Sequence, residues 1–344
     1  MSKEARLGRV MENEMREQPR VLDHVIGRRE RLLDEVSEKL PRSPRGVAVV
    51  ARGTSDNAAL FGRYLIEYTS GLIVSQVAPS LLTLYGSHVD YSGFVAVAAS
   101  QSGQTREIIA VLERLQELGA FGVAVTNDRS SSLGEIADLV LGLEAGPELA
   151  VPATKTFTAQ IAVFTILAEA LGSPSWSTRD WDRVPIAAQS VLDDDLPARQ
   201  VAAEIGEAPG IICVGRGFMF PIALEAALKL KETSRILAEG HSAADLRHGP
   251  IAVIEEDFPV LAFTGAGPTE TDMQDLIETL RARGAKVFEV GSSAHADVRI
   301  PDGLPEVMEA MPAVIRAQQV ALWLARHRDM NPDRPPGLSK VTAG

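Results

Sequence analysis

Short runs of apolar residues alternate along the chain with longer segments in which apolar residues recur at helical spacing. The run FVAVAA at 94–99 is followed by REIIAVLERLQELG at 106–119 and then by FGVAVTN at 121–127. Such short runs are typical of strands buried on both faces of a parallel sheet, and the spaced segments are typical of amphipathic helices. The order strand, helix, strand therefore predicts βαβ units with right-handed crossovers.

The same pattern occurs twice along the chain. An Arg-Gly pair follows an apolar run at 52–53 and again at 216–217, a shift of 164 residues, and Val95 corresponds to Val260, a shift of 165 residues. Two copies of one strand–helix pattern indicate an internal duplication. We therefore expect an α/β chain of two tandem subdomains, each a parallel sheet flanked by helices.

Three further segments complete the predicted organisation. Residues 4–40 carry a helical pattern, the polar stretch at 173–185 is expected to be a linker, and the Pro- and Gly-containing tail at 331–344 is expected to be irregular. The predicted domains are an N-terminal helix with the first subdomain, the second subdomain, and the tail, at 1–190, 191–331 and 332–344.

Composition excludes several classes of function. The 344 residues carry a formal net charge of −12, which argues against a partner such as nucleic acid or an anionic membrane. The N-terminus is too polar for a signal peptide, and no stretch of 18 apolar residues occurs, so we expect a cytoplasmic protein without a membrane span. The single cysteine, Cys213, lies in an apolar run and is expected to be a small core residue.

The loop SQSGQT at 100–105 joins a predicted strand to a predicted helix. In a parallel sheet such a loop lies at the carboxyl edge, where ligands bind, and a helix N-terminus offers unpaired N–H groups to an anion. Capping the helix would need only one Ser or Thr. The surplus of polar groups predicts a phosphate-binding loop formed by Ser100, Gln101, Ser102 and Thr105, with Gly103 letting the backbone come close.

The corresponding loop of the second copy is TGAGPT at 264–269. We align Ser100 with Gly265 and Ser102 with Gly267, so that the second copy lacks the hydroxyl groups. This alignment predicts one phosphate loop per chain, in the first half.

A second polar turn, GTSD at 53–56, follows the first strand. Thr54 and Ser55 would either cap the next helix or bind ligand hydroxyls, and both interpretations stay open. No GxGxxG or GxxxxGK[ST] pattern occurs, which disfavours nucleotide binding.

The second half carries a charged motif that the first half lacks. Glu225, Lys229 and Glu232 follow one another at spacings of four and three residues, on one side of a predicted helix. One interpretation is a solvated stripe of ion pairs. However, the neighbouring positions are mostly apolar, so a partly buried carboxylate that acts as a base is the alternative.

His248 precedes Gly249 and Pro250, directly before an expected apolar strand. It would be a turn residue or, next to a sugar, the acid and base that opens the ring, because histidine side chains ordinarily exchange protons near neutral pH. The other histidines show no metal-ligand spacing, so we expect no metal: His24, His88, His241, His295 and His327.

Five motifs together resemble the sugar isomerase (SIS) family: SQSGQT at 100–105, AVPATKTFTAQ at 150–160, GRGFMFPIALEAALKLKETS at 215–234, AEGHSAADLRHGP at 238–250 and LSKVT at 338–342. Within it, the chain is similar to the isomerase part of the glutamine–fructose-6-phosphate aminotransferases (glucosamine-6-phosphate synthases) and to the stand-alone SIS-type glucosamine-6-phosphate deaminases. The resemblance implies two flavodoxin-like αβα sandwiches with five parallel strands each, an assembly that is at least dimeric, a sugar-phosphate substrate and no cofactor.

The resemblance also implies binding roles. The phosphate would be held by the loop of Ser100, Gln101, Ser102 and Thr105. Thr54 and Ser55 match the turn that helps to bind the sugar phosphate, and Val151 matches a backbone position that contacts the sugar. Glu225 and Lys229 match polar groups near the sugar.

Three residues match catalytic positions of the family. Glu232 matches the base that moves a proton between C1 and C2. His248 matches the ring-opening histidine, which the neighbouring subunit of a homodimer supplies. Lys340 matches the lysine of the tail that closes the active site, near the open-chain carbonyl.

The chain also departs from the synthases. Ser2 stands where a synthase has its nucleophilic cysteine, and Pro335-Pro336-Gly337 replaces a Pro-Arg-Asn near the tail lysine. We therefore expect no glutaminase domain and no use of glutamine as ammonia donor. The predicted reaction converts glucosamine 6-phosphate to fructose 6-phosphate and ammonia. The alternatives are a dehydratase acting on N-acetylglucosamine 6-phosphate by C2 deprotonation and loss of the C3 hydroxyl, and a non-catalytic sugar-phosphate-binding regulator.

Overall fold

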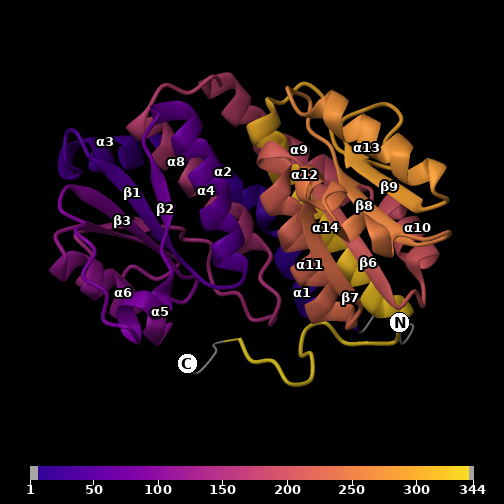
Figure 1. The fold of residues 1–344 in the computed structure, drawn as a ribbon, viewed down its shortest axis with the longest axis horizontal. Coiled ribbons are helices and arrows are strands. Elements are labelled where there is room, and N and C mark those ends of the chain that lie inside the picture. The colour runs from indigo at the N-terminus through magenta and orange to yellow at the C-terminus, as the bar shows by residue number, and fades with distance from the viewer. Residues whose placement is uncertain (1–6, 341–344) are drawn as a thin grey trace. The chain divides into compact units, whose positions relative to one another are not determined.

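The computed structural model describes residues 7–340 of the chain (Figure 1). Contacts between residues divide these into two compact units. The first-repeat unit comprises residues 21–148 and 155–177, and the second-repeat unit comprises residues 7–20, 149–154 and 178–340. Each unit is described by itself.

The first-repeat unit is built on a five-stranded sheet in the order β2-β1-β3-β4-β5. All four pairings are parallel. The β1, β3 and β4 strands are buried along nearly their whole length, as expected for strands covered on both faces. The strands are β1 (Gly46–Val50), β2 (Val74–Gln76), β3 (Phe94–Ala99), β4 (Phe121–Thr126) and β5 (Leu139–Gly142).

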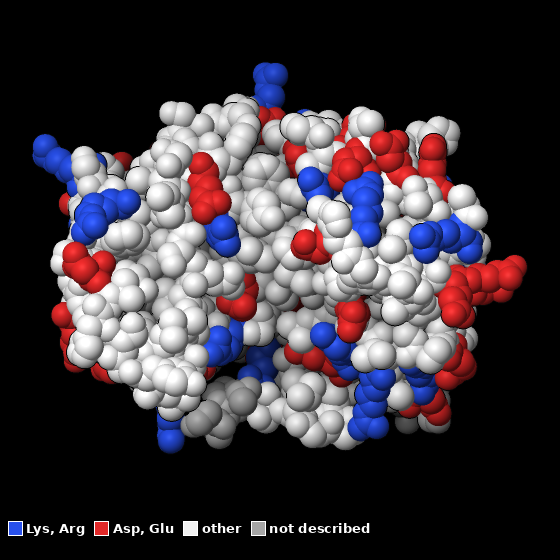
Figure 2. Space-filling model, viewed as in Figure 1, with Lys and Arg blue, Asp and Glu red and all other residues white. Residues whose placement is uncertain are grey.

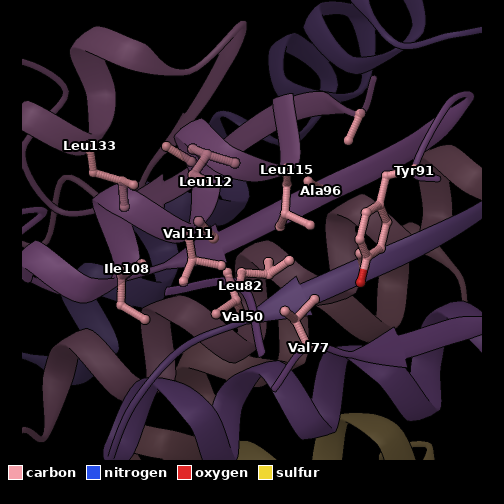
Figure 3. Close-up of a cluster of buried hydrophobic side chains, with 14 residues drawn as sticks. Val50, Val77, Leu82, Tyr91, Ala96, Ile108, Val111, Leu112, Leu115 and Leu133 are labelled. Atoms are coloured by element: carbon pink, nitrogen blue, oxygen red, sulfur yellow. The ribbon is translucent and has the colours of Figure 1, made fainter. Parts of the chain in front are cut away.

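Helices cover both faces of this sheet. On one face, Ile108, Val111 and Leu115 of α6 pack against Val50 and Ala96 of the sheet (Figure 3). On the other face, α4 packs along α8, a helix buried along nearly its whole length. The helices are α2 (Gln18–Gly27), which the second-repeat unit shares up to residue 20, α3 (Arg29–Lys39), α4 (Thr54–Ser70), α5 (Pro79–Thr83), α6 (Arg106–Glu117), α7 (Ser132–Ile136) and α8 (Lys155–Leu171).

The second-repeat unit contains a second five-stranded sheet in the order β10-β9-β8-β6-β7. Its pairings are also parallel. Read from the β7 edge, each strand has the same neighbours as its counterpart in the first sheet, which is the flavodoxin-like order. The predicted duplication and fold class are therefore confirmed. The strands are β6 (Gly210–Gly215), β7 (Leu237–Ser242), β8 (Pro259–Phe263), β9 (Lys286–Gly291) and β10 (Val298–Arg299).

Helices again flank the second sheet. The α12 and α13 helices pack on one face through Leu246, Met273 and Leu276, whereas α11 contacts β6 and β8, and α14 contacts α9, α10 and α11. The helices are α1 (Arg9–Arg16), α9 (Thr178–Asp193), α10 (Leu196–Ile205), η2 (Gly217–Met219), α11 (Phe220–Ser234), α12 (Ala243–Arg247), η3 (Pro250–Val253), α13 (Glu270–Ala282) and α14 (Glu306–His327).

The segments of the two units interleave along the chain. Residues 7–20 and 149–154 belong to the second-repeat unit. The sequence pattern instead predicts contiguous domains that meet at residue 190, and these domain boundaries stay a prediction.

Two expected elements differ in the structure. The helical pattern at 4–40 forms three helices, α1 to α3, with breaks at Glu17 and Arg28, and residues 1–6 lie outside the described part. The expected linker at 173–185 is wrong from Thr178 onward, where α9 begins. Trp181 and Val184 are fully buried there, so packing stabilises a helix despite Pro185 within it.

Within residues 7–340, no helix is both long enough and apolar enough to cross a bilayer.

The contact between α4 and α8 leads to a stability prediction. Alanine in place of glycine within a helix ordinarily adds about 1 kcal/mol of stability. At Gly62, however, a Cβ would lie 2.3 Å from Cδ1 of Phe164. We expect Gly62→Ala to lower the free energy of unfolding by about 1–3 kcal/mol, measured by urea denaturation.

Gly27 provides the matched control, because a Cβ there would meet no atom within 4 Å. Gly27→Ala is expected to leave the free energy of unfolding unchanged or to raise it. Equal effects of the two substitutions would contradict the close packing of Gly62 on Phe164.

Candidate functional site

The SQSGQT loop follows β3 at the carboxyl edge of the first sheet. The N–H of Ser100 donates to the carbonyl of Val125 in β4 at 3.0 Å, which fixes the start of the loop. Gly103 has φ +63°, and a Cβ there would lie 2.0 Å from Oγ of Ser131. Glycine is therefore required at this position, and the loop folds tightly against the start of α7.

The hydroxyl groups of this loop are not used to cap α6. Thr105 is the N-cap residue, but its side chain makes no capping hydrogen bond. Its Oγ1 lies 3.1 Å from Oγ of Ser100, and Oγ of Ser102 accepts the N–H of Gln104 at 3.2 Å. The first-turn N–H groups of a helix have no intrahelical partner and attract anions. Helix capping therefore does not explain the composition of the loop.

The GTSD turn follows β1, which pairs with β3, so both turns lie at the same edge of the sheet. The N-cap residue of α4 is Gly53, and Thr54 and Ser55 lie in the first turn of the helix. Ser55 is buried, and its Oγ accepts a hydrogen bond from Nε2 of Gln160 at 2.8 Å. The side chain of Ser55 is thus hydrogen-bonded to α8, and Ser55 is not the N-cap of α4.

An ion pair that the sequence analysis missed connects the two turns. Arg52, directly after β1, donates to both carboxylate oxygens of Glu107 in α6, at 2.9 and 3.1 Å. Glu107 lies in the first turn of α6. The guanidinium therefore offsets a negative charge beside the predicted phosphate loop. No pattern in the sequence signals this pair, because its members are 55 residues apart.

The structure corrects the alignment of the second loop. The N–H of Thr264 donates to the carbonyl of Val290, as the N–H of Ser100 does to that of Val125, and Thr269 is the N-cap of α13. Thr264 is therefore the counterpart of Ser100, and the alignment of Ser100 with Gly265 and of Ser102 with Gly267 is wrong by one residue. The apolar runs are compatible with Ser100 matching either Thr264 or Gly265. Only the pairing of the strands shows that Thr264 is the counterpart.

The second loop is occupied by carboxylates of its own unit. Oγ1 of Thr264 donates to Glu289 at 2.8 Å, and Oγ1 of Thr269 donates to Glu306 at 2.9 Å. The N–H of Ala266 donates to Glu309 at 2.8 Å. Its terminal hydroxyls and one backbone donor are thus already bound by negative charge, which supports the expectation of one phosphate loop per chain.

The charged motif of α11 lies inside the second-repeat unit. Glu225 and Lys229 are fully buried, with Nζ of Lys229 3.4 Å from Oε1 of Glu225. Lys229 also pairs with Glu232, whose side chain is 21% exposed. Burial lowers the pKa of Lys229, but the two carboxylates outweigh it and raise that pKa above its ordinary value. A solvated stripe is therefore excluded, and Glu232 is the member of the cluster that reaches the surface.

His248 lies exposed at the C-terminal end of α12, and its N–H donates to the carbonyl of Asp245 at 3.0 Å. The apolar strand expected after it is wrong. Residues 250–253 form the 3₁₀ helix η3, and Val253 is 57% exposed. An apolar run of four residues was too short to distinguish these structures. The catalytic role of His248 stays a prediction.

Val151 and Lys340 lie in segments without regular structure. The N–H of Val151 donates to the carbonyl of Asp333 at 3.3 Å, so a contact between its backbone and a sugar would use the Val151 carbonyl. The tail is irregular over 331–340, as predicted, and the last two residues of the LSKVT motif lie outside the described part.

The predicted site residues fall into two groups. The first-repeat unit contains Thr54, Ser55, Ser100, Gln101, Ser102 and Thr105. The second-repeat unit contains Val151, Glu225, Lys229, Glu232, His248 and Lys340. Over residues 7–340, no three His, Cys, Asp or Glu side chains are grouped so that they could hold a metal ion.

Charge on the surface is mixed. On the face drawn in Figure 2, acidic and basic side chains are interspersed over each unit, and no continuous basic surface is visible.

Comparison with known proteins identifies the family. The sequence model of the SIS domain matches residues 42–170 and 204–297, which include most strands of the two sheets. The chain belongs to the SIS domain family. The family predicted from the five motifs is confirmed.

Named relatives of this SIS chain include isomerizing glutamine–fructose-6-phosphate aminotransferases. The protein of Methanothermobacter thermautotrophicus is 32% identical over 326 residues, which cover 92% of this chain and 53% of that protein. The protein of Pyrococcus horikoshii is 33% identical over 342 residues, 96% of this chain and 57% of that protein. The chain spans about half the length of the curated relatives that it matches.

Solved structures share the SIS fold. A candidate phosphosugar isomerase from Silicibacter pomeroyi DSS-3 superposes with a TM-score of 0.84 at 28% identity, covering 94% of this chain and 99% of that chain. A glucosamine-6-phosphate deaminase from Thermotoga maritima superposes with a TM-score of 0.77 at 22% identity, covering 93% and 98%, a likeness that shows the fold alone.

The hydroxyls of the SIS chain's first loop lead to a binding prediction. A hydrogen bond to a charged group contributes about 1.5–3 kcal/mol. We therefore expect the double variant Ser100→Ala/Thr105→Ala to bind fructose 6-phosphate more than about tenfold more weakly, measured by calorimetry. Thr269→Ala, the matching change in the second loop, is the control and should leave the affinity unchanged. Equal affinities of the double variant and the wild type would rule out the phosphate loop.

The carboxylates in the second loop lead to a pH prediction. Burial raises the pKa of Glu306, and the neighbouring Glu309 raises it further. The folded state therefore binds this proton more tightly, and the free energy of unfolding falls as the pH rises from the ordinary pKa of 4.5 to the raised value. Glu306→Gln keeps an acceptor for Thr269 and removes the charge.

We expect Glu306→Gln to raise the free energy of unfolding at pH 7 by about 1 kcal/mol relative to the wild type. The gain should vanish below pH 4.5. Urea denaturation across this pH range measures it, with Glu278→Gln on the exposed face of α13 as a control for general charge effects. A gain in the free energy of unfolding that does not depend on pH would contradict a raised pKa of Glu306 as its cause.

Proposed function

We propose that the chain is an amino-sugar phosphate isomerase and deaminase, which converts glucosamine 6-phosphate and water to fructose 6-phosphate and ammonia. The buried cluster of Glu225, Lys229 and Glu232 carries this proposal. It combines a fixed ammonium with a carboxylate that reaches the surface, as a base for moving a proton between carbon atoms requires. The similarity to isomerizing glutamine–fructose-6-phosphate aminotransferases supports a sugar-phosphate substrate.

Each step has an assigned group. The loop of Ser100 and Thr105 binds the phosphate, and His248, supplied by the neighbouring subunit of a homodimer, opens the pyranose. The carboxylate of Glu232 takes the proton from C2 of the open aldose and returns it to C1. The enolamine formed in between becomes a ketimine at C2. Water adds to C2 and ammonia leaves, which balances the reaction without an oxidant or reductant.

Lys229 would keep its charge throughout these steps. Its ammonium is paired with two carboxylates, which raise its pKa. It therefore orients Glu232 and does not act as a proton donor. Lys340 is assigned to the open-chain carbonyl oxygen, where an ammonium would stabilise the developing negative charge.

The alternative reaction uses the same base on an N-acetylated sugar phosphate. An amide nitrogen does not readily become an imine, so the enolate formed at C2 would expel the C3 hydroxyl. The products separate the two reactions, because deamination releases ammonia and dehydration yields an unsaturated sugar that absorbs ultraviolet light. A regulator that only binds sugar phosphates would give neither product.

The test of the proposed function is direct. The purified protein is incubated with glucosamine 6-phosphate and, separately, with N-acetylglucosamine 6-phosphate, and ammonia, fructose 6-phosphate and ultraviolet absorbance are followed. Ammonia and fructose 6-phosphate in equal amounts from the first substrate are expected. A chromophore from the second substrate alone would replace deamination with dehydration, and binding without turnover would favour the regulator.

Glu232→Gln is the variant that tests the base. General base catalysis contributes about 10²–10⁴-fold, so kcat should fall by that factor, whereas binding of fructose 6-phosphate should change little. Glu278→Gln, an exposed glutamate in a helix of the same unit, is the control. A loss of less than about tenfold in the Glu232 variant would assign the base to another residue.

A further inference from the structure

The C-terminal tail caps the N-terminal helix of the second-repeat unit. The two carboxylate oxygens of Asp333 accept the N–H groups of Val10 and Met11, at 3.1 and 2.8 Å. Oδ1 of Asn331 accepts the N–H of Gly8 at 3.1 Å. The N-cap residue of α1, Gly8, has no side chain for this purpose. The free N–H groups at a helix start are usually bound by a local Ser or Asp. Here they are bound by residues more than 320 positions away.

Close packing supports these hydrogen bonds. Gly8 has φ +70°, and a Cβ there would lie 2.5 Å from Cδ1 of Leu322 and 2.6 Å from Cγ of Pro332. The tail can therefore cross the start of α1 only because position 8 is glycine. Asp333 is 9% exposed, so its carboxylate is largely shielded from water.

The same helix holds the segment 149–154. Glu14 of α1 is buried and accepts the N–H groups of Leu149 and Ala150, the latter at 3.2 Å. The next N–H along the chain, that of Val151, donates to the carbonyl of Asp333 at 3.3 Å. Asp333 thus contacts α1 through its side chain and the 149–154 segment through its backbone.

A buried pair of amides holds the other end of this segment. Nε2 of Gln318, in α14, donates to the carbonyl of Thr154 at 3.4 Å, and Oε1 of Gln318 accepts from Gln18 at 2.8 Å. The segment is therefore tied at both ends to helices of its own unit. These bonds account for the grouping of residues 149–154 and 7–20 with the second repeat.

Two predicted site residues depend on this arrangement. Val151 is the backbone position expected to contact the sugar, and Lys340 follows Asp333 by seven residues in the tail. The carboxylate of Asp333 holds the tail at the start of α1. Its carbonyl accepts the N–H of Val151 and so helps to hold that backbone. The residues between Asp333 and Lys340 lie in no helix or strand.

We propose that Asp333 is a positioning residue, which uses the N-terminus of α1 to set the Val151 backbone and the tail that carries Lys340. The role rests on the proposed function, because it supposes that Val151 and Lys340 act on the sugar phosphate. In this proposal Asp333 acts through Val151 and Lys340 and not on the substrate itself. Its carboxylate aligns with the positive end of the α1 dipole, which strengthens the cap.

The first part of the test does not depend on activity. Hydrogen exchange of the backbone amides is measured for Asp333→Ala, for Asp333→Asn, and for the control Arg334→Ala, which changes an exposed residue of the same tail. The amides of Val10, Met11 and Val151 should exchange faster in Asp333→Ala than in the wild type. Asp333→Asn keeps one oxygen acceptor and should give an intermediate rate, and Arg334→Ala should not differ from the wild type.

The second part measures turnover of glucosamine 6-phosphate under conditions in which circular dichroism shows each variant folded. Misplacing a catalytic group by about 1 Å can lower the rate about 10²-fold, so kcat/KM of Asp333→Ala should fall about 10- to 100-fold. Both kcat and KM should change, because Lys340 acts in the reaction and Val151 acts in binding. Asp333→Asn should recover most of the loss.

The outcomes separate the two proposals. A wild type that turns over no sugar phosphate defeats the proposed function and the positioning role with it, while the exchange rates still decide whether Asp333 caps α1. An active wild type with unchanged kcat/KM in Asp333→Ala overturns the positioning role alone. Unchanged exchange in Asp333→Ala overturns the cap. A loss of activity that follows global unfolding, with kcat and KM restored at lower temperature, also overturns the positioning role.

Discussion

The parallel arrangement of the strands is the constraint on which the rest of this chain depends. All strands of a parallel sheet end at one edge, so the turns after β1 and β3 meet there, although about 50 residues separate them. This edge brings the GTSD turn and the SQSGQT loop together and lets Arg52 reach Glu107. The second sheet has the same strand order and brings its own turns together in the same way. Chemistry can therefore differ between the repeats while the scaffold stays the same.

The equivalent loops of the two repeats differ in their partners within the structure. Among the described residues, the hydroxyls of the first loop make no recorded hydrogen bond to a carboxylate, and Oγ of Ser100 contacts Oγ1 of Thr105 instead. In the second loop, Glu289, Glu306 and Glu309 bind the donors of the loop. Burial raises the pKa of Glu306 and of Glu309, as expected where carboxylates share a confined region. The second repeat carries a different charged group on α11, where Lys229 is buried and pairs with Glu225 and Glu232.

The α1 helix holds two irregular segments of the second-repeat unit. It is eight residues long and would be marginal in isolation, yet it receives Asp333 from the tail and holds the segment after Glu148 through Glu14. Arg326 of α14 fixes it further by donating to Glu12 at 2.6 Å and to the carbonyl of Leu7 at 3.0 Å. Burial raises the pKa of Glu12, but Arg326 and Arg16 outweigh that effect and lower it. A short helix thus organises two irregular segments that the predicted chemistry requires.

The sequence by itself determined the repeated strand–helix order, the duplication, the family and the small-residue loops. The strand–helix order and the duplication follow from short apolar runs and from apolar residues at helical spacing, which are local properties. The family follows from the resemblance of five motifs, and the small-residue loops are read directly from the residues, Gly103 among them. Only the tertiary structure decided the register of the second loop, the helix at 178–193, the 3₁₀ turn after His248, and the burial of Glu225 and Lys229. The sequence also did not predict three hydrogen bonds, those of Asp333 to α1, of Ser55 to Gln160 and of Thr269 to Glu306. Each joins residues far apart in the chain, and such contacts depend on how elements pack, which no local pattern encodes.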